Sequence, residues 1–124
     1  TGLVMKVINN SMLQIYVSGL IEMMPLAKKA GWPIETVLNI LCGGSAGLPL
    51  LTDKILKILG TNESIGFTNY GTAKGDDVFR KVLKNFGLKS PVLKGFDVQK
   101  NLARKFDLLE RDLAELIRAA YQNS

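Results

Sequence analysis

The stretch that decides the fold is LVMKVINNSMLQIYVSGLIEMMPLAKKA, residues 3–30. Apolar residues occupy nearly every side of a helix built on it, which is the pattern of a central, buried helix. Pro25 should kink this helix, because a proline removes a hydrogen bond and clashes with the preceding turn. Gly31 should end it. Gln14, Glu22 and Pro25 interrupt the apolar run, so it predicts a helix buried in protein rather than a membrane span.

Two polar residues in this stretch, Lys6 and Asn10, are candidates for chemistry. Residues four apart lie on one helix face, roughly 6 Å apart. A buried lysine loses hydration, which favours its neutral form. It can then exchange a proton with a hydroxyl that the neighbouring amide orients, which is the equipment for proton transfer at an alcohol carbon. The spacing also fits a solvated lysine on the polar edge of an ordinary amphipathic helix.

The remainder of the sequence predicts further helices and no convincing strand, so we expect an all-α fold. Pro33 suits the first turn of a helix. The polar, glycine-containing segment 61–75 is predicted to be a loop, after which Asp76 or Asp77 caps the next helix. Asp97 is predicted to cap a long C-terminal helix. The predicted helices after the first one cover residues 33–41, 48–59, 76–86 and 97–122.

The predicted C-terminal helix carries apolar residues at alternating spacings of four and three, which is typical of a heptad seam. Two interpretations remain open: the seam packs on the chain's own core, or it also packs against a second subunit. The second interpretation predicts a homodimer or a higher homo-oligomer. The seam consists of Leu102, Phe106, Leu109, Leu113, Leu116 and Ala120.

Composition excludes several classes of site. The 124 residues suit a single domain covering 1–124. There is no histidine and only one cysteine, Cys42. This excludes an internal disulfide, a histidine-based triad and a metal site of histidines or thiolates, so we predict no metal. A lone cysteine suits a reducing cytoplasm. The hydrophobic fraction of 47% exceeds what a free-standing domain needs, which hints at surface buried against a partner.

The net charge of +5 has three interpretations. The lysines and arginines form an ordinary solvated face, or they attract a small anionic substrate or a dinucleotide phosphate, or they bind nucleic acid. Nucleic acid ranks last, because aromatics make up only 7% and no nucleic-acid motif accompanies the charges. The chain begins at Thr1 without a methionine or a signal peptide, and we expect it to be a domain of a longer chain.

Four stretches, in order, resemble the C-terminal helical domain of the β-hydroxyacid dehydrogenases, the group that contains 3-hydroxyisobutyrate dehydrogenase and 6-phosphogluconate dehydrogenase. The likeness covers roughly residues 2–92. The first stretch is similar to the family's Gly-x-x-x-Lys-x-x-x-Asn helix and the third to its Gly-Gly-Ser-Ala-Gly turn. The stretches are Gly2 to Asn10; Glu22 with Leu26 to Gly31; Leu41 to Gly47; and Gly66-Phe67 with Lys74, Gly87 and Pro91.

The resemblance implies roles for four residues. Lys6 matches the catalytic lysine, the general acid/base, and Asn10 the amide that orients the substrate. Phe67 matches a wall of the substrate site. Lys74 matches the lysine of the family's Lys-Asp-Leu motif, near the cofactor. This sequence differs from the motif after the lysine, since Gly75 stands in place of the aspartate and Asp76 in place of the leucine.

The resemblance also implies an NAD(P)-dependent oxidoreductase that acts on a small hydroxyacid. No Gly-x-Gly-x-x-Gly fingerprint is present in the sequence. We therefore expect NAD or NADP to be bound mainly by an N-terminal Rossmann domain outside this chain, and this helical domain to supply the catalytic lysine and a dimer interface. The alternatives are a non-catalytic helical dimerisation or interaction module, and the central domain of a nucleotide-sugar dehydrogenase, which also has a Lys-x-x-x-Asn helix.

Overall fold

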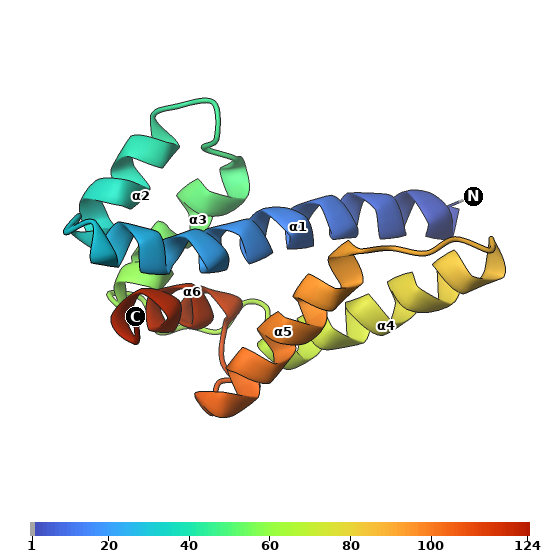
Figure 1. The fold of residues 1–124 in the computed structure, drawn as a ribbon. Helices are drawn as coiled ribbons and strands as arrows, with labels where there is room; N and C mark the ends of the chain where they lie inside the picture. The colour runs from blue at the N-terminus through green and yellow to red at the C-terminus, as the bar shows by residue number, and fades with distance from the viewer. Residues whose placement is uncertain (1) are drawn as a thin grey trace.

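The computed structural model describes residues 2–124, and within them the chain is helical throughout, as predicted (Figure 1). The pairing of Thr68 with Asp112 is an isolated antiparallel bridge and not part of a sheet. No helix in the described part of the chain is long and apolar enough to cross a membrane. The six helices are α1 (Gly2–Lys29), α2 (Ile34–Cys42), α3 (Pro49–Leu59), α4 (Asn69–Asn85), α5 (Val92–Lys105) and α6 (Leu113–Gln122).

Helix α1 is the long rod on which the other helices assemble (Figure 1). Helices α2 and α6 pack on its C-terminal half and α3 packs on these two, while α4 runs beside its N-terminal half and α5 also packs on α1. The helix continues past Pro25 to Lys29, and Gly31, with a φ of +83°, follows its end. Glycine adopts this left-handed conformation without the steric cost that a side chain would impose. Both the long helix and its predicted end are therefore confirmed.

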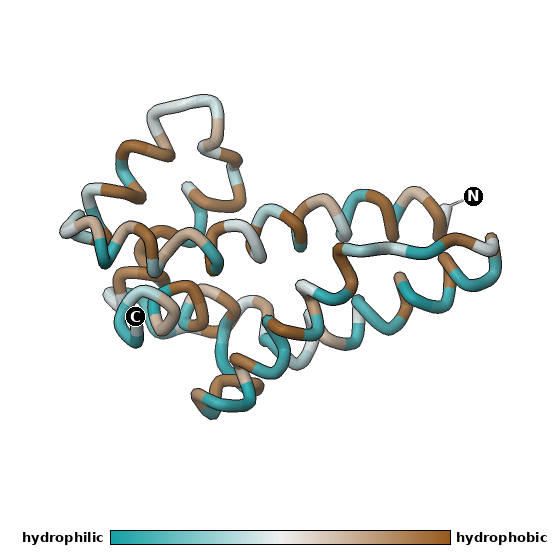
Figure 2. Tube along the Cα trace, viewed as in Figure 1, coloured by the Kyte–Doolittle hydropathy of each residue, from teal (hydrophilic) through white to brown (hydrophobic). Residues whose placement is uncertain are grey.

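The chain buries only one face of α1, whereas the sequence predicts burial on nearly every side. The buried residues recur every three or four positions, as one stripe of a helix does. The outer face of the N-terminal half is apolar and exposed, with Met5, Ile8 and Met12 each about half or more exposed. Figure 2 shows hydrophobic segments continuing along α1 toward its N-terminal end. The buried stripe is Val7, Ser11, Gln14, Val17, Leu20, Ile21 and Met24.

The predicted loop over residues 61–75 is wrong in its second half, because α4 begins at Asn69 rather than near Asp76. Thr68 is the N-cap, and its hydroxyl accepts a hydrogen bond of 2.9 Å from the Gly71 amide. Threonine at this position satisfies an amide that the helix leaves unpaired. The sequence did not predict this start, because Gly71 and Gly75 lie inside α4 and glycine is a poor helix former.

The single C-terminal helix predicted over residues 97–122 is also wrong. The chain forms α5 and α6 instead, separated by a turn in which Asp107 adopts a φ of 56°. The Leu108 amide closes α5 with a 2.8 Å bond to the Ala103 carbonyl, and Asp112 caps α6 through the Ala114 amide. A positive φ at a residue other than glycine breaks a helix, because the left-handed conformation cannot continue it.

The apolar seam on these helices belongs to the chain's own core. The residues of its α6 part, Leu113, Leu116 and Ala120, are buried, and Leu102, Phe106 and Leu109 pack against the same core. The apolar spacing of four and three therefore arises from two helices, α5 and α6, that pack on the same core, and not from one continuous helix. The seam therefore gives no support to a dimer.

The Asp112 carboxylate joins three separate parts of the chain. It is 1% exposed and accepts hydrogen bonds from the Gly66, Phe67 and Ala114 amides at 2.8, 3.2 and 2.9 Å. The Lys54 ammonium lies 3.0 Å from each carboxylate oxygen, and the Lys57 ammonium lies 3.3 Å from Oδ2. Burial alone raises the pKa of Asp112, but the amide and lysine hydrogen bonds outweigh it and hold that pKa well below its usual range.

Replacing this carboxylate should destabilise the fold at neutral pH. Asp112→Asn removes the charge that Lys54 and Lys57 share, and breaking a buried pair costs about 3 kcal/mol. The depressed pKa stabilises the folded chain above the ordinary value of 3.8, and this contribution is lost as pH falls below it. Urea unfolding should show a large deficit for Asp112→Asn at pH 7 that shrinks at pH 3.

The matched control is Asp97→Asn, which removes the carboxylate of an exposed pair with Arg80 at 3.0 Å. An exposed pair contributes about 0–1 kcal/mol, so this variant should unfold near the unmutated chain. Equal stability of Asp112→Asn and the unmutated chain at pH 7 would contradict the role given to the carboxylate.

Candidate functional site

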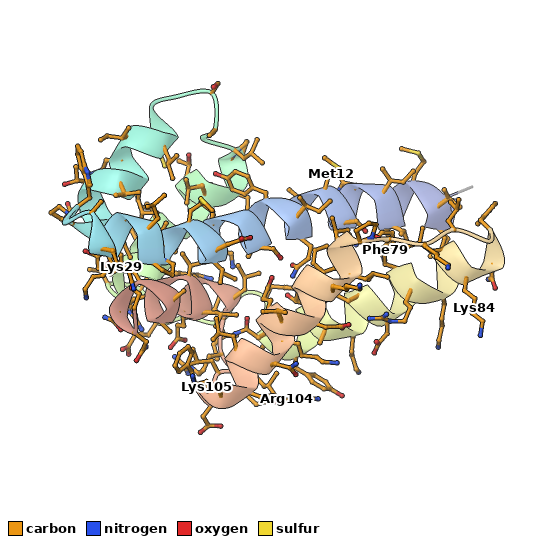
Figure 3. The ribbon with its side chains drawn as sticks, in the orientation of Figure 1. Met12, Lys29, Phe79, Lys84, Arg104 and Lys105 are labelled. Atoms are coloured by element: carbon orange, nitrogen blue, oxygen red, sulfur yellow. The ribbon has the colours of Figure 1, made fainter. Side chains whose placement is uncertain are left out.

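A cavity of about 600 Å³ lies between α1, α3 and α4, and we call it the α1–α4 cavity. Most of its surface is apolar, and Val7, Val17, Leu50 and Phe79 are among the residues that line it. In Figure 3, Phe79 lies on the side of α1 that faces α4 and α5, whereas Met12 points away from it. Polar side chains reach the cavity at a few points only, as is typical of small-molecule sites. They are Lys6, Asn10, Ser11, Gln14, Lys54, Thr72 and Asp76.

Lys6 and Asn10 occupy successive turns of α1, and both line the α1–α4 cavity. The helical register that the sequence predicts for this pair is therefore present. Both residues are exposed, so the burial expected for Lys6 is not provided by the described chain. An exposed ammonium beside an apolar cavity loses water only when something covers it.

The structure places the other two predicted residues differently. Phe67 lines the cavity from the turn before α4, with half of its surface exposed, and its amide is fixed on Asp112. Lys74 is exposed on α4, with its ammonium 5.1 Å from the centre of the Tyr70 ring, and it is outside the set of residues that line the cavity. The structure thus brings Lys6, Asn10 and Phe67 to one cavity, and the role of Lys74 stays a prediction.

A polar contact fixes the wall of the cavity formed by α1. The Gln14 amide donates to the Gln99 carbonyl oxygen at 2.8 Å, and the Ser18 hydroxyl donates to the same oxygen at 2.5 Å. Both glutamines are buried. Buried polar groups that satisfy one another hold their elements in one register, so α1 is held on α5 directly beside the turns that carry Lys6 and Asn10.

Sequence reasoning missed two charged residues of the cavity, Lys54 and Asp76. The sequence predicts Asp76 only as a possible helix cap. Burial is the main cause that raises its pKa to about 7, and the neighbouring carboxylates of Asp97 and Asp77 add to the shift, while Lys100 and Arg80 oppose it. Its position after Gly75, where the family motif has leucine, was the one signal that this part of the site departs from the pattern.

Comparison with known proteins identifies the family. Residues 1–120 match the family described as NAD-binding of NADP-dependent 3-hydroxyisobutyrate dehydrogenase. The chain belongs to this family. The family match covers nearly the whole chain, which agrees with the resemblance found in the sequence, and favours it over the nucleotide-sugar dehydrogenase alternative. No curated protein matches the chain in sequence.

The fold is also shared with a solved dehydrogenase. The 3-hydroxyisobutyrate dehydrogenase from Salmonella typhimurium superposes with a TM-score of 0.80 over 93% of this chain, at 13% identity. The chain spans 40% of the length of that protein. At this identity the likeness establishes the fold alone: the six helices are arranged as they are in part of that dehydrogenase.

The raised pKa of Asp76 predicts a pH-dependent cost to stability. The folded chain keeps a proton that the unfolded chain, with an ordinary pKa of 3.8, releases, so stability should fall as pH rises from about 4 to about 7. Asp76→Asn removes this cost. The variant should be more stable than the unmutated chain by about 1 kcal/mol at pH 8, a discounted figure because solvent reaches the carboxyl.

Thermal unfolding at pH 4 and pH 8 measures this difference. At pH 4 the difference should be small, since the carboxyl is protonated in the folded chain and the unfolded chain, with a pKa of 3.8, has only begun to release its proton above that pH. The exposed Asp53 of α3 provides the control, because Asp53→Asn should leave stability unchanged at either pH. A destabilised Asp76→Asn at pH 8 would show that the carboxylate is stabilised there instead.

Proposed function

We propose that this chain is the substrate-side domain of an NAD(P)-dependent 3-hydroxyacid dehydrogenase or reductase, with Lys6 as its general acid/base. One observation carries the proposal: Lys6 and Asn10 lie one turn apart on the wall of an apolar cavity, in a chain of the 3-hydroxyisobutyrate dehydrogenase family. Phe67 on the same cavity supports it as a wall of the substrate site.

The chemistry follows from the groups at the cavity. The Lys6 Nζ accepts the hydroxyl proton as the alcohol is oxidised and returns it in the reduction, and Asn10 holds that hydroxyl through its amide. NAD or NADP, when bound, supplies the hydride acceptor or donor. The apolar lining excludes water from the carbon that reacts, which strengthens the interactions of Lys6 with its substrate.

The described residues offer one contact for a dinucleotide and do not form a complete cofactor site. Lys74 is exposed on α4 and free to meet an anionic or nicotinamide group. The sequence lacks the glycine-rich turn that cradles a pyrophosphate. We therefore propose that the cofactor is held mainly by an N-terminal Rossmann domain, and that this chain contributes Lys74.

The exposed apolar face of α1 supports the proposal that a separate domain holds the cofactor. Met5, Ile8 and Met12 form a stripe on the face of α1 away from Lys6 and Asn10, and an apolar patch of this kind marks a surface that another part of a protein covers. We propose that the cofactor domain covers it. The homodimer stays a prediction without a located surface, because the seam proposed for it is core.

A non-catalytic interaction module would use the same apolar face of α1 for assembly. Such a module gains nothing from a lysine and an amide beside a cavity. Substitution of Lys6 therefore separates the two functions, since it removes turnover from a dehydrogenase and leaves an assembly module unaffected.

Lys6→Ala in the full-length protein should lower kcat for a 3-hydroxyacid by roughly 10²–10⁴-fold, because general acid/base catalysis contributes about that much. Asn10→Ala should have a milder effect, through substrate orientation. Turnover is followed by the absorbance of NADPH or NADH. Lys81, exposed on α4 and outside the residues that line the cavity, serves as the control, and Lys81→Ala should turn over normally. Near-normal kcat for Lys6→Ala would remove Lys6 from the catalytic role.

The 124-residue chain alone should neither bind dinucleotide tightly nor oxidise hydroxyacids, because the phosphate-cradling turn is missing. Calorimetric titration of the chain with NAD and with NADP tests this directly. Circular dichroism should show that the titrated chain is helical. Micromolar affinity for either cofactor would contradict the proposed division between the two domains.

A further inference from the structure

The positive charge of the chain is concentrated around the end of α4. Residues 78–96 contain five basic residues and no acidic residue, whereas the whole chain has 16 basic and 11 acidic residues, so the rest of the chain is neutral in sum. Lys81, Lys84 and Lys89 in this segment are exposed. None of the three forms an ion pair among the described residues. Their charges are therefore available to an anionic partner.

The turn after α4 adds exposed apolar side chains to this charge. Phe86 is 66% exposed and Leu88 is 59% exposed. Gly87 between them has a φ of +67°, and the Leu88 amide donates to the Leu83 carbonyl at 2.9 Å, which fixes the backbone of the turn. In a helix end of this kind the apolar residue after the glycine usually packs back on the helix. Here the turn holds both apolar side chains out in solvent instead.

The lysines and the apolar side chains lie close together. Lys81 is about 6 Å along the axis from the end of α4, because each helical residue rises 1.5 Å. Figure 1 shows the turn at one end of the molecule, and Figure 3 shows the Lys84 side chain extending away from the ribbon there. None of these residues lines the α1–α4 cavity. We call this group the α4–α5 tip, and it consists of Lys81, Lys84, Phe86, Leu88 and Lys89.

The shape and chemistry of the α4–α5 tip fit a lipid surface better than a nucleic acid. Nucleic acid strands are bound in basic grooves, whereas the tip is a projecting turn that lines neither of the cavities found among the described residues. Leu88 would also gain nothing from contact with phosphates. An anionic membrane accommodates both kinds of side chain, because lysines meet the headgroups while apolar side chains enter the boundary of the acyl chains. Lysine stems can lie along apolar surface with the ammonium in the headgroup layer.

We propose that the α4–α5 tip binds the surface of membranes that contain anionic lipids. Lys81, Lys84 and Lys89 contact the headgroups, and Phe86 and Leu88 enter the outer part of the apolar layer. Three charges and two apolar side chains give a weak and reversible association, since stable anchoring takes stronger signals. This attachment is separate from the proposed dehydrogenase chemistry, which takes place in the α1–α4 cavity.

Co-sedimentation of the full-length protein with vesicles at millimolar lipid tests the proposal. The protein should sediment with vesicles of phosphatidylcholine mixed with phosphatidylserine and stay in solution with phosphatidylcholine alone. High salt should release it, because salt screens the lysines. Lys84→Gln with Lys89→Gln should weaken binding by roughly 20-fold, since each lysine near an anionic surface strengthens binding by about fivefold. Phe86→Ser should weaken it by roughly tenfold, through the lost apolar contact.

The matched control removes the same charge elsewhere. Lys29 and Lys105 are exposed and lie far from Lys84 in Figure 3. Lys29→Gln with Lys105→Gln should therefore change vesicle binding by less than about threefold, as remote charges do. All of these variants should keep normal kcat, which separates this test from that of Lys6.

A fluorescence measurement locates the contact without removing a charge. Phe86→Trp places an indole at the α4–α5 tip, and the emission that it adds to that of the unmutated protein should shift to shorter wavelength with phosphatidylserine vesicles. Lipids brominated in their acyl chains should quench this added emission.

Three results would overturn the proposal: no sedimentation with phosphatidylserine vesicles, an equal loss of binding in the Lys29 and Lys105 control, or an unchanged indole emission from vesicle-bound Phe86→Trp. Binding to a DNA duplex that is tighter than binding to vesicles, and that is lost in the Lys84 and Lys89 variant, would assign the α4–α5 tip to nucleic acid and also reject the membrane. None of these results bears on the catalytic role proposed for Lys6.

Discussion

The buried Asp112 carboxylate is the interaction on which the rest of the structure depends. It caps α6, fixes the turn at residues 66–67 and holds the lysines of α3, so that elements from the middle and the end of the chain meet at one point. An unpaired buried carboxylate costs several kcal/mol. These contacts must therefore form together, and once formed they set the positions of α3 and of the turn before α4, two of the walls that enclose the α1–α4 cavity.

The α1 wall of that cavity follows from the sequence by a simpler rule. A helix places residues four apart on one face, so Lys6 and Asn10 reach the same space without any tertiary information. Most of the remaining apolar residues of α1 divide between a buried stripe and an exposed outer stripe at Met5, Ile8 and Met12. A helix that is apolar on both sides implies a second covering surface, which in the proposed enzyme is the cofactor domain.

Local signals predicted much of the fold, whereas tertiary contacts decided the parts that were missed. Glycine and proline correctly marked the ends of the first three helices, and the motif around Lys6, Asn10 and Phe67 gathered residues that do share a cavity. The break between α5 and α6 could not be predicted, because the apolar spacing passes through it unchanged and the cap at Asp112 is completed by Lys54, 58 positions away. Lys54 itself resembles any solvated lysine in the sequence, and only the packing of α3 reveals what it contacts.

A crystal structure of the full-length protein with NADP and a 3-hydroxyacid bound tests the central claim most directly. The account predicts that the hydroxyacid occupies the α1–α4 cavity, with its hydroxyl oxygen within hydrogen-bond distance of the Lys6 Nζ and of the Asn10 amide. It also predicts that the exposed stripe of α1 is covered by the domain that holds the cofactor. A hydroxyacid bound away from Lys6, or a cavity filled by protein side chains in the complete molecule, would contradict it.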